Sequence, residues 1–269
     1  MMELEEKLLF YGIKNYNINE DGSVDVEGDV NLARLNLVEL PFTFRKVTGN
    51  FICSYNQLTT LKGAPIHVGL DFYCEINHLT SLIGGPKTVG YSYNCNKNNL
   101  ISLEGAPKTI KGDFMCSYNQ LESLEHGPEE VECIFACIFN QLKTLKGAPK
   151  KVGGHFCCIN NNLTSLEGGP IHVDGDFFCT RNQLTTLKGA PEYVGQDFVC
   201  NENNLTSLEG SPKIVDGSFY CNMNPLKSLD GGPEKIRQNF YYLKISRGSD
   251  FSEEHIRKQL DLGGVVYLS

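Results

Sequence analysis

A repeat of 21 residues dominates this sequence. Nine cysteines recur at this constant interval from Cys53 to Cys221, and an asparagine lies three residues after each of them. Two leucines, a proline and a β-branched residue then follow in every repeat. Self-similarity at such an interval is typical of solenoids, in which stacked coils bury one another's apolar faces. The sequence therefore predicts a stack of coils rather than one globular core.

The repeat unit is F-x-C-x-x-N-x-L-x-[ST]-L-x-G-x-P-x-x-V. The aromatic residue and the cysteine alternate with a variable residue, so they share the inward face of a short strand. The asparagine can satisfy backbone groups of a neighbouring coil, and the proline blocks a helix and fixes an extended return. The pattern predicts a mainly β solenoid with one long parallel sheet on its concave face. The convex side is expected to be loop-like or extended.

Both ends of the chain depart from the repeat and predict caps. Residues 1–27 are expected to form an N-terminal cap, with a helix over residues 2–11 and a β-hairpin around Asp21-Gly22. Residues 28–239 predict ten coils, the first of them degenerate. Residues 240–269 predict a C-terminal cap of strand, helix and strand, with Ser252 as helix N-cap. Caps cover the apolar surface and the strand edge of a terminal coil.

Charge and hydropathy narrow the class of protein. The net charge of -8 and the pI near 5.3 argue against general binding to nucleic acid or to an anionic membrane. No stretch is apolar enough for a membrane span, and the N-terminus is acidic where a signal peptide is basic. The eleven cysteines are odd in number and contain no C-x-x-C pair. We expect a cytoplasmic protein without a disulfide scaffold.

The repeats resemble the leucine-rich-repeat pattern in their strand and asparagine portion. They look like the short repeats of bacterial effector proteins, in which a proline segment replaces the helix. A closer resemblance is to the uncharacterised leucine-rich-repeat proteins of tailed bacteriophages, through the unit GDFFCTRNQLTTLKGAPEYV (residues 175–194) and the leader YNINEDGSVDVEGDVNL (residues 16–32). This resemblance covers nearly the whole chain. It implies a leucine-rich-repeat fold and no catalytic motif.

Residues that could carry chemistry are few and scattered. None of the six histidines is placed beside an evident nucleophile, and His126 stands where other repeats have glycine. Cys133 and Cys157 lie outside the cysteine series and could be partly exposed and oxidisable. The sequence contains no phosphate-binding or dinucleotide-binding motif outside the glycines of the repeat. We therefore expect no catalytic residues, no metal and no cofactor.

The outward strand positions vary and are strongly apolar near the middle of the chain. Exposed aromatic and methionine-rich patches often mark binding sites. The sequence predicts a central apolar binding patch formed by Met115, Tyr118, Ile134, Ile138, Phe139, Ile159 and Phe178. It also predicts an acidic rim formed by Asp71, Asp113, Asp176 and Asp197. These residues could instead be ordinary strand formers, or the patch could serve self-association into a homo-oligomer.

The leading functional hypothesis is a non-enzymatic protein-binding scaffold. Together with the phage resemblance, it predicts a protein that binds and modulates a protein of the bacterial host, in the host cytosol. One alternative is a structural or accessory component of the virion. Another is a small-nucleotide-binding protein, which would need a polar pocket with basic groups that the repeats do not provide.

Overall fold

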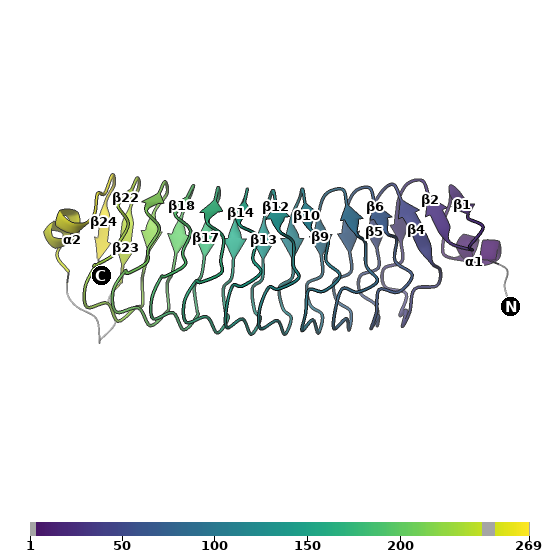
Figure 1. Cartoon of the computed structure of the whole chain (residues 1–269), viewed down its shortest axis with the longest axis horizontal. Helices are drawn as coiled ribbons and strands as arrows, with labels where there is room; N and C mark the ends of the chain where they lie inside the picture. The colour runs from purple at the N-terminus through teal and green to yellow at the C-terminus, as the bar shows by residue number, and fades with distance from the viewer. Residues whose placement is uncertain (1–3, 244–250, 269) are drawn as a thin grey trace.

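The computed structural model describes residues 4–243 and 251–268 as one elongated stack of coils (Figure 1). The N-terminal and C-terminal segments lie at opposite ends of this stack. Each coil contributes one strand to a long sheet that runs the length of the molecule. The predicted mainly β solenoid, with a long parallel sheet and a short helix near each end, is confirmed.

The long sheet contains twelve strands, and the pairing is parallel between every two neighbours. From β3 to β23 its register steps by 21 residues, so that Phe51 pairs with Phe72 and Phe72 with Tyr93. The strands are β3 (Val30–Asn31), β5 (Phe51–Ile52), β7 (Phe72–Tyr73), β9 (Tyr93–Asn94), β11 (Phe114–Met115), β13 (Phe135–Ala136), β15 (Phe156–Cys157), β17 (Phe177–Phe178), β19 (Phe198–Val199), β21 (Phe219–Tyr220), β23 (Phe240–Tyr242) and β24 (Val266–Leu268).

The core consists of equivalent buried side chains that repeat from coil to coil, with Tyr93 in place of phenylalanine in one coil. The aromatic residue that opens each repeat is fully buried, and from Phe51 to Phe240 the rings of neighbouring coils lie 4.9 to 5.9 Å apart between centroids. The cysteines from Cys53 to Cys221 and both leucines of each repeat are buried beside these rings. One coil alone could not bury this surface, so the stack is the folding unit.

The repeating asparagine connects each coil to the coil before it. The Asn119 amide nitrogen donates to the carbonyl oxygens of Cys116 (3.0 Å) and of Cys95 in the preceding coil (3.1 Å). Its side-chain oxygen accepts from the backbone N–H of Leu100 (3.0 Å), again in the preceding coil. These bonds repeat along the stack and satisfy backbone groups that would otherwise be buried without a partner.

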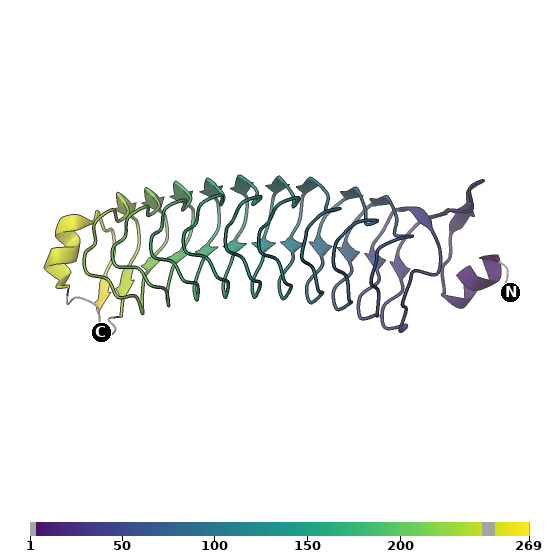
Figure 2. The ribbon, with the colours of Figure 1, turned by 60° about the horizontal axis from the view of Figure 1, so that its bottom comes forward.

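The return segment of each coil differs from the expected loop-like side in one respect. It is extended, but neighbouring returns are also hydrogen-bonded, and they form a second row of short strands (Figure 2). Identical coils place any extended segment beside its own copy at strand-pairing distance, which explains the pairing. A corner of three residues, such as 69–71, separates each return strand from the next strand of the long sheet.

The second row consists of two sheets. One has the order β1-β2-β4-β6-β8 and the other has the order β10-β12-β14-β16-β18-β20-β22. The strands of the first are β1 (Tyr16–Ile18), β2 (Val24–Val26), β4 (Phe44–Val47), β6 (His67–Val68) and β8 (Thr88–Val89). The strands of the second are β10 (Thr109–Ile110), β12 (Glu130–Val131), β14 (Lys151–Val152), β16 (His172–Val173), β18 (Tyr193–Val194), β20 (Ile214–Val215) and β22 (Lys235–Ile236).

Short helices flank the stack at its two ends. Helix α1 (Leu4–Phe10) buries Leu8, and the hairpin of β1 and β2 follows it. Helix α2 (Glu253–Gln259) buries Ile256, and the Ser252 side chain caps its N-terminus by accepting from the backbone N–H of His255 (3.1 Å). Over the described residues, the model has no helix with the length and hydropathy of a membrane span.

Candidate functional site

The outward side chains of the long sheet form one continuous surface. We call this surface the long-sheet face and define it by three rows, in which each coil supplies one residue to each row. The first row lies just before the buried aromatic residue (29, 50, 71 and so on to 239), the second between the aromatic residue and the cysteine (31, 52, 73 to 241), and the third just after the cysteine (33, 54, 75 to 243). Side chains of the second row from Ile52 to Tyr241 are half-buried. Their apolar parts therefore meet both the sheet and the solvent.

The predicted central patch lies on this face and beside it. Met115 and Phe178 belong to the second row, Ile134 to the first, and Ile138 and Ile159 to the third, all of them half-buried. Tyr118 and Phe139 follow the third row and are 48% and 45% exposed. Their rings stack at 4.8 Å between centroids. The structure thus brings Tyr118 and Phe139 into direct contact and places the other five on the three rows of neighbouring coils.

The position of Tyr118 and Phe139 has an unusual backbone. Each has a positive φ (58° and 52°), and the equivalent residues from Arg34 to Met223 have it too. Residues with a Cβ adopt this left-handed conformation at a cost of about 1–2 kcal/mol. The coil accepts this cost because the turn must place the following asparagine between two coils. Side chains at this position consequently project from the edge of the long-sheet face, as Arg34 does over the Tyr55 ring (3.9 Å).

The predicted rim residues also bond the coils together. A side-chain oxygen of Asp71 accepts from the backbone N–H of Ser92 (2.8 Å), and one of Asp113 accepts from that of Ile134 (3.0 Å). Asp176 and Asp197 accept in the same way from the next coil. Asn50, Ser92, His155 and Ser218 use this position for the same hydrogen bond. This position therefore usually supplies an acceptor, with Ile134 as an exception, and it does not need a negative charge.

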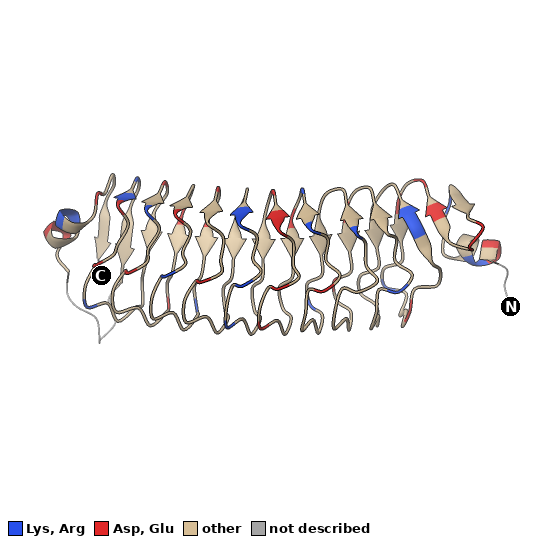
Figure 3. Ribbon diagram, in the orientation of Figure 1, with Lys and Arg blue, Asp and Glu red and all other residues tan. Residues whose placement is uncertain are grey.

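The electrostatic character of the long-sheet face is nevertheless one-sided. Its three rows contain neither Lys nor Arg. They contain six acidic residues, Asp29, Asp71, Glu75, Asp113, Asp176 and Asp197. Figure 3 shows the strands of the long sheet free of basic residues, whereas the return strands β4 and β14 carry them. Arg34, Lys97 and Arg181 lie one position beyond the third row, and Arg181 pairs with Glu202 (2.9 Å).

Glu75 lies in the N-terminal part of this face and differs from the other acids. One of its carboxylate oxygens is buried without a hydrogen-bond partner among the described residues. Burial raises the pKa of Glu75 above its ordinary value. Hydrogen bonds from its own backbone N–H and from the Ser54 side chain favour the charged form, but burial outweighs them.

The histidines contact acceptors or donors on the surface rather than a nucleophile. His155 Nδ1 lies 3.1 Å from an Asp176 oxygen, and His172 Nε2 lies 2.7 Å from an Asp174 oxygen. His67 Nδ1 contacts the Thr88 hydroxyl at 2.7 Å. Within residues 4–243 and 251–268, no three His, Cys, Asp or Glu side chains are grouped as metal ligands.

The thiols are held in their neutral form by burial. Burial raises the pKa of the cysteines from Cys53 to Cys221 far above the ordinary range. Outside this series, Cys133 and Cys157 are half-buried, and burial raises the pKa of Cys157 to about 12. Since the thiolate is the reactive and metal-binding form, Cys157 is poorly suited to nucleophilic chemistry at neutral pH.

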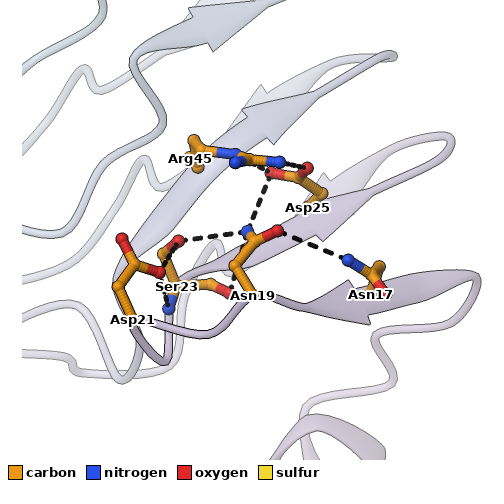
Figure 4. Close-up of polar contacts among 6 residues, drawn as sticks. All are labelled: Asn17, Asn19, Asp21, Ser23, Asp25 and Arg45. Atoms are coloured by element: carbon orange, nitrogen blue, oxygen red, sulfur yellow. Dashed lines mark hydrogen bonds and ion pairs between the residues drawn. The ribbon is translucent and has the colours of Figure 1, made fainter.

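A second polar cluster lies at the N-terminal hairpin (Figure 4). Arg45 holds the Asp25 carboxylate through two contacts, which lower the pKa of that carboxyl group. Asn19 donates to Ser23 and Asp25, and Asp21 accepts from the Ser23 hydroxyl and backbone N–H. A hollow of about 460 Å³ adjoins the hairpin and is lined in part by Asn17, Asp25 and Lys46. The cluster satisfies its own polar groups and fixes the hairpin against β4.

Comparisons with known proteins concern the fold. The backbone is similar to that of YopM from Yersinia enterocolitica WA-314, with 16% sequence identity and a TM-score of 0.29 over 81% of this chain. The matched region spans 66% of that YopM chain. No protein-family model matches the sequence, and no curated protein does.

Sequence reasoning missed two features of this surface. The left-handed backbone at the position of Tyr118 and Phe139 could not be recognised, because this position holds aromatic, charged and β-branched residues and no glycine. The hydrogen bonds that first-row side chains accept from the backbone of the next coil were also missed. Asp, Asn, Ser and His at this position all have an atom that can accept a hydrogen bond. This shared ability to accept a hydrogen bond is the sequence feature from which the bonds could have been predicted.

Proposed function

We propose that this chain is a non-enzymatic scaffold that binds another protein on its long-sheet face, with the central patch as the anchor. The observation that supports the proposal best is the stacked and exposed pair of Tyr118 and Phe139 beside half-buried Ile138 and Ile159. Large, exposed aromatic side chains are typical of binding hot spots. Equivalent turns of neighbouring coils hold the two rings stacked on each other, so binding would cost little ordering entropy.

We also propose that the partner is a protein of a bacterial host. The resemblance of the repeats to phage leucine-rich-repeat proteins favours a phage-encoded chain that acts on a protein of the bacterial host. The same resemblance is the reason to search for the partner in bacterial lysate.

The experiment compares capture by three immobilised proteins. The parent chain and the variant Ile138→Asp/Phe139→Asp are incubated with bacterial lysate, and bound proteins are identified by mass spectrometry. The matched control is Ile83→Asp/Ile171→Asp, which adds the same two charges at exposed apolar residues outside the long-sheet face. We expect a partner that the parent and the control capture and the patch variant loses, with unchanged thermal unfolding of all three. Equal capture by the patch variant would refute the proposed anchor.

A further inference from the structure

The charges of the long-sheet face are arranged around the central patch, not over it. Asp71, Glu75 and Asp113 lie toward the N-terminal side, and Asp176 and Asp197 lie toward the C-terminal side. The step from Asp113 to Asp176 covers three coils, or about 14 Å at the usual strand spacing. Between them the first row holds Ile134 and His155, and the third row holds Ile138 and Ile159.

The hydrogen bonds of the first row do not remove this negative charge. The donors to Asp71, Asp113 and Asp197 are neutral backbone N–H groups or a tyrosine hydroxyl. Asp176 also lies beside His155, whose Nδ1 accepts from the Asp176 backbone N–H and so does not neutralise the carboxylate. A partner that covers the face would therefore bring its own groups against carboxylates with no lysine or arginine in the three rows. Bringing like charges together across an interface costs free energy, and opposite charges are selected.

From this arrangement we infer that the long-sheet face recognises a cationic protein segment with apolar side chains at its centre and Lys or Arg on both sides. The inference rests on the proposed function and adds the chemistry of the partner. The apolar centre packs on the Tyr118–Phe139 stack, and the flanking cations face the two acidic groups. A nucleic acid or an anionic lipid surface would meet the wrong sign of charge.

Glu75 fits the same partner. Its carboxyl group has one buried oxygen without a hydrogen-bond partner among the described residues, and its neighbours Ser54 and Asn96 in the third row are uncharged. A cation that approaches this carboxyl group would favour its ionised form, which burial alone disfavours. Among the described residues, none of the first-row aspartates named above has a buried oxygen without a partner.

The test uses synthetic peptides of about twelve residues, long enough to span the roughly 14 Å between the acidic groups when extended. The probe has Leu and Phe at its centre and Lys at both ends. One comparison peptide replaces Lys by Glu, and a second keeps Lys but replaces the apolar centre by Ser. Binding to the full chain is measured by fluorescence anisotropy at low and at moderate salt.

The chain offers matched variants for this measurement. Asp71→Asn, Asp113→Asn and Asp197→Asn together remove three charges and keep the acceptor oxygen, as Asn50 and Asn239 already do at this position. The control Glu122→Gln, Glu129→Gln and Glu167→Gln changes net charge equally at exposed residues off the long-sheet face. We expect the Asp variant to bind the cationic probe about tenfold more weakly and the control to bind it as the parent does.

The other possible results distinguish the roles of charge, of the apolar centre and of the binding surface itself. Equal weakening by both triple variants, or binding of the anionic peptide as tight as that of the cationic one, would overturn the inference about charge. Equal binding of the peptide with the Ser centre would overturn the role of the apolar centre. If these peptides fail while Ile138→Asp/Phe139→Asp still abolishes lysate capture, the proposed binding surface stands and only the partner's chemistry is wrong. If that variant also captures normally, the proposed function fails as well.

Discussion

At the scale of single residues, the asparagine after each strand makes the most important polar contacts between coils. Asn119 donates to the carbonyl oxygens of Cys116 and Cys95, and its side-chain oxygen accepts from two buried backbone N–H groups. Asn119→Ala should lower the free energy of unfolding by about 1–3 kcal/mol, because it leaves the backbone N–H groups of Leu100 and Asn98 without a partner. The two carbonyl oxygens keep the Asn140 and Asn98 side-chain amides as donors. Urea titration measures the loss. The exposed Asn162→Ala serves as control and should change stability by less than about 0.5 kcal/mol; equal effects at both positions would contradict this role.

His126 is a residue whose replacement should stabilise the protein. It is exposed and has φ 67°, at the position where Gly105 and Gly147 have φ 100° and 92°. Since a left-handed residue with a Cβ is strained, His126→Gly should raise the free energy of unfolding by about 1 kcal/mol. The reverse change, Gly147→Ala, should destabilise, because an added Cβ would also overlap the Leu124 carbonyl oxygen. Thermal unfolding compares the two, and a lower melting temperature for His126→Gly would argue against backbone strain.

At the scale of elements, the strands of the long sheet stack their thiols into a buried column that makes stability depend on alkaline pH. Burial raises the pKa of these thiols, so each stays protonated in the folded state while it ionises in the unfolded chain above about pH 8.5. Their contribution is complete below that pH and is lost as the pH rises toward the folded pKa. The loss is about 1 kcal/mol per thiol between about pH 8.5 and 9.5.

This dependence can be measured by urea titration under reducing conditions across that pH range. Cys116→Ala removes one thiol, so its stability should fall less steeply by about 1 kcal/mol over the same interval. A free energy of unfolding that does not change with pH in the parent chain would mean that the thiols are not buried together.

The strands of the long sheet could be predicted because the 21-residue period shows which residues of different coils occupy equivalent positions. The β-hairpin and the Ser252 cap were predictable from local turn and capping chemistry. The second row of strands was not. Its members, such as His67–Val68, have two residues, too few for any periodicity, and they follow a proline that argues against a strand. Only the stacking of identical coils brings them into register.

At the scale of the whole molecule, the sequence could predict which residues lie on the long-sheet face but not the contacts that their side chains make. Alternation along each strand identified the outward rows, including Met115 and Phe178. It could not show that Tyr118 and Phe139 stack, because their contact depends on the left-handed turn. Nor could it show that Asp113 also bonds the next coil. Both facts follow from contacts between residues 21 apart in the sequence.

The stack of coils is tested most directly by mapping which cysteines react with N-ethylmaleimide, in native protein and in denaturant, by mass spectrometry. At neutral pH the nine cysteines from Cys53 to Cys221 at 21-residue intervals, all of them buried, should stay unmodified in the native protein. In denaturant all eleven should react. Rapid native modification of the buried series would contradict the inward-facing column and the long-sheet face that depends on it.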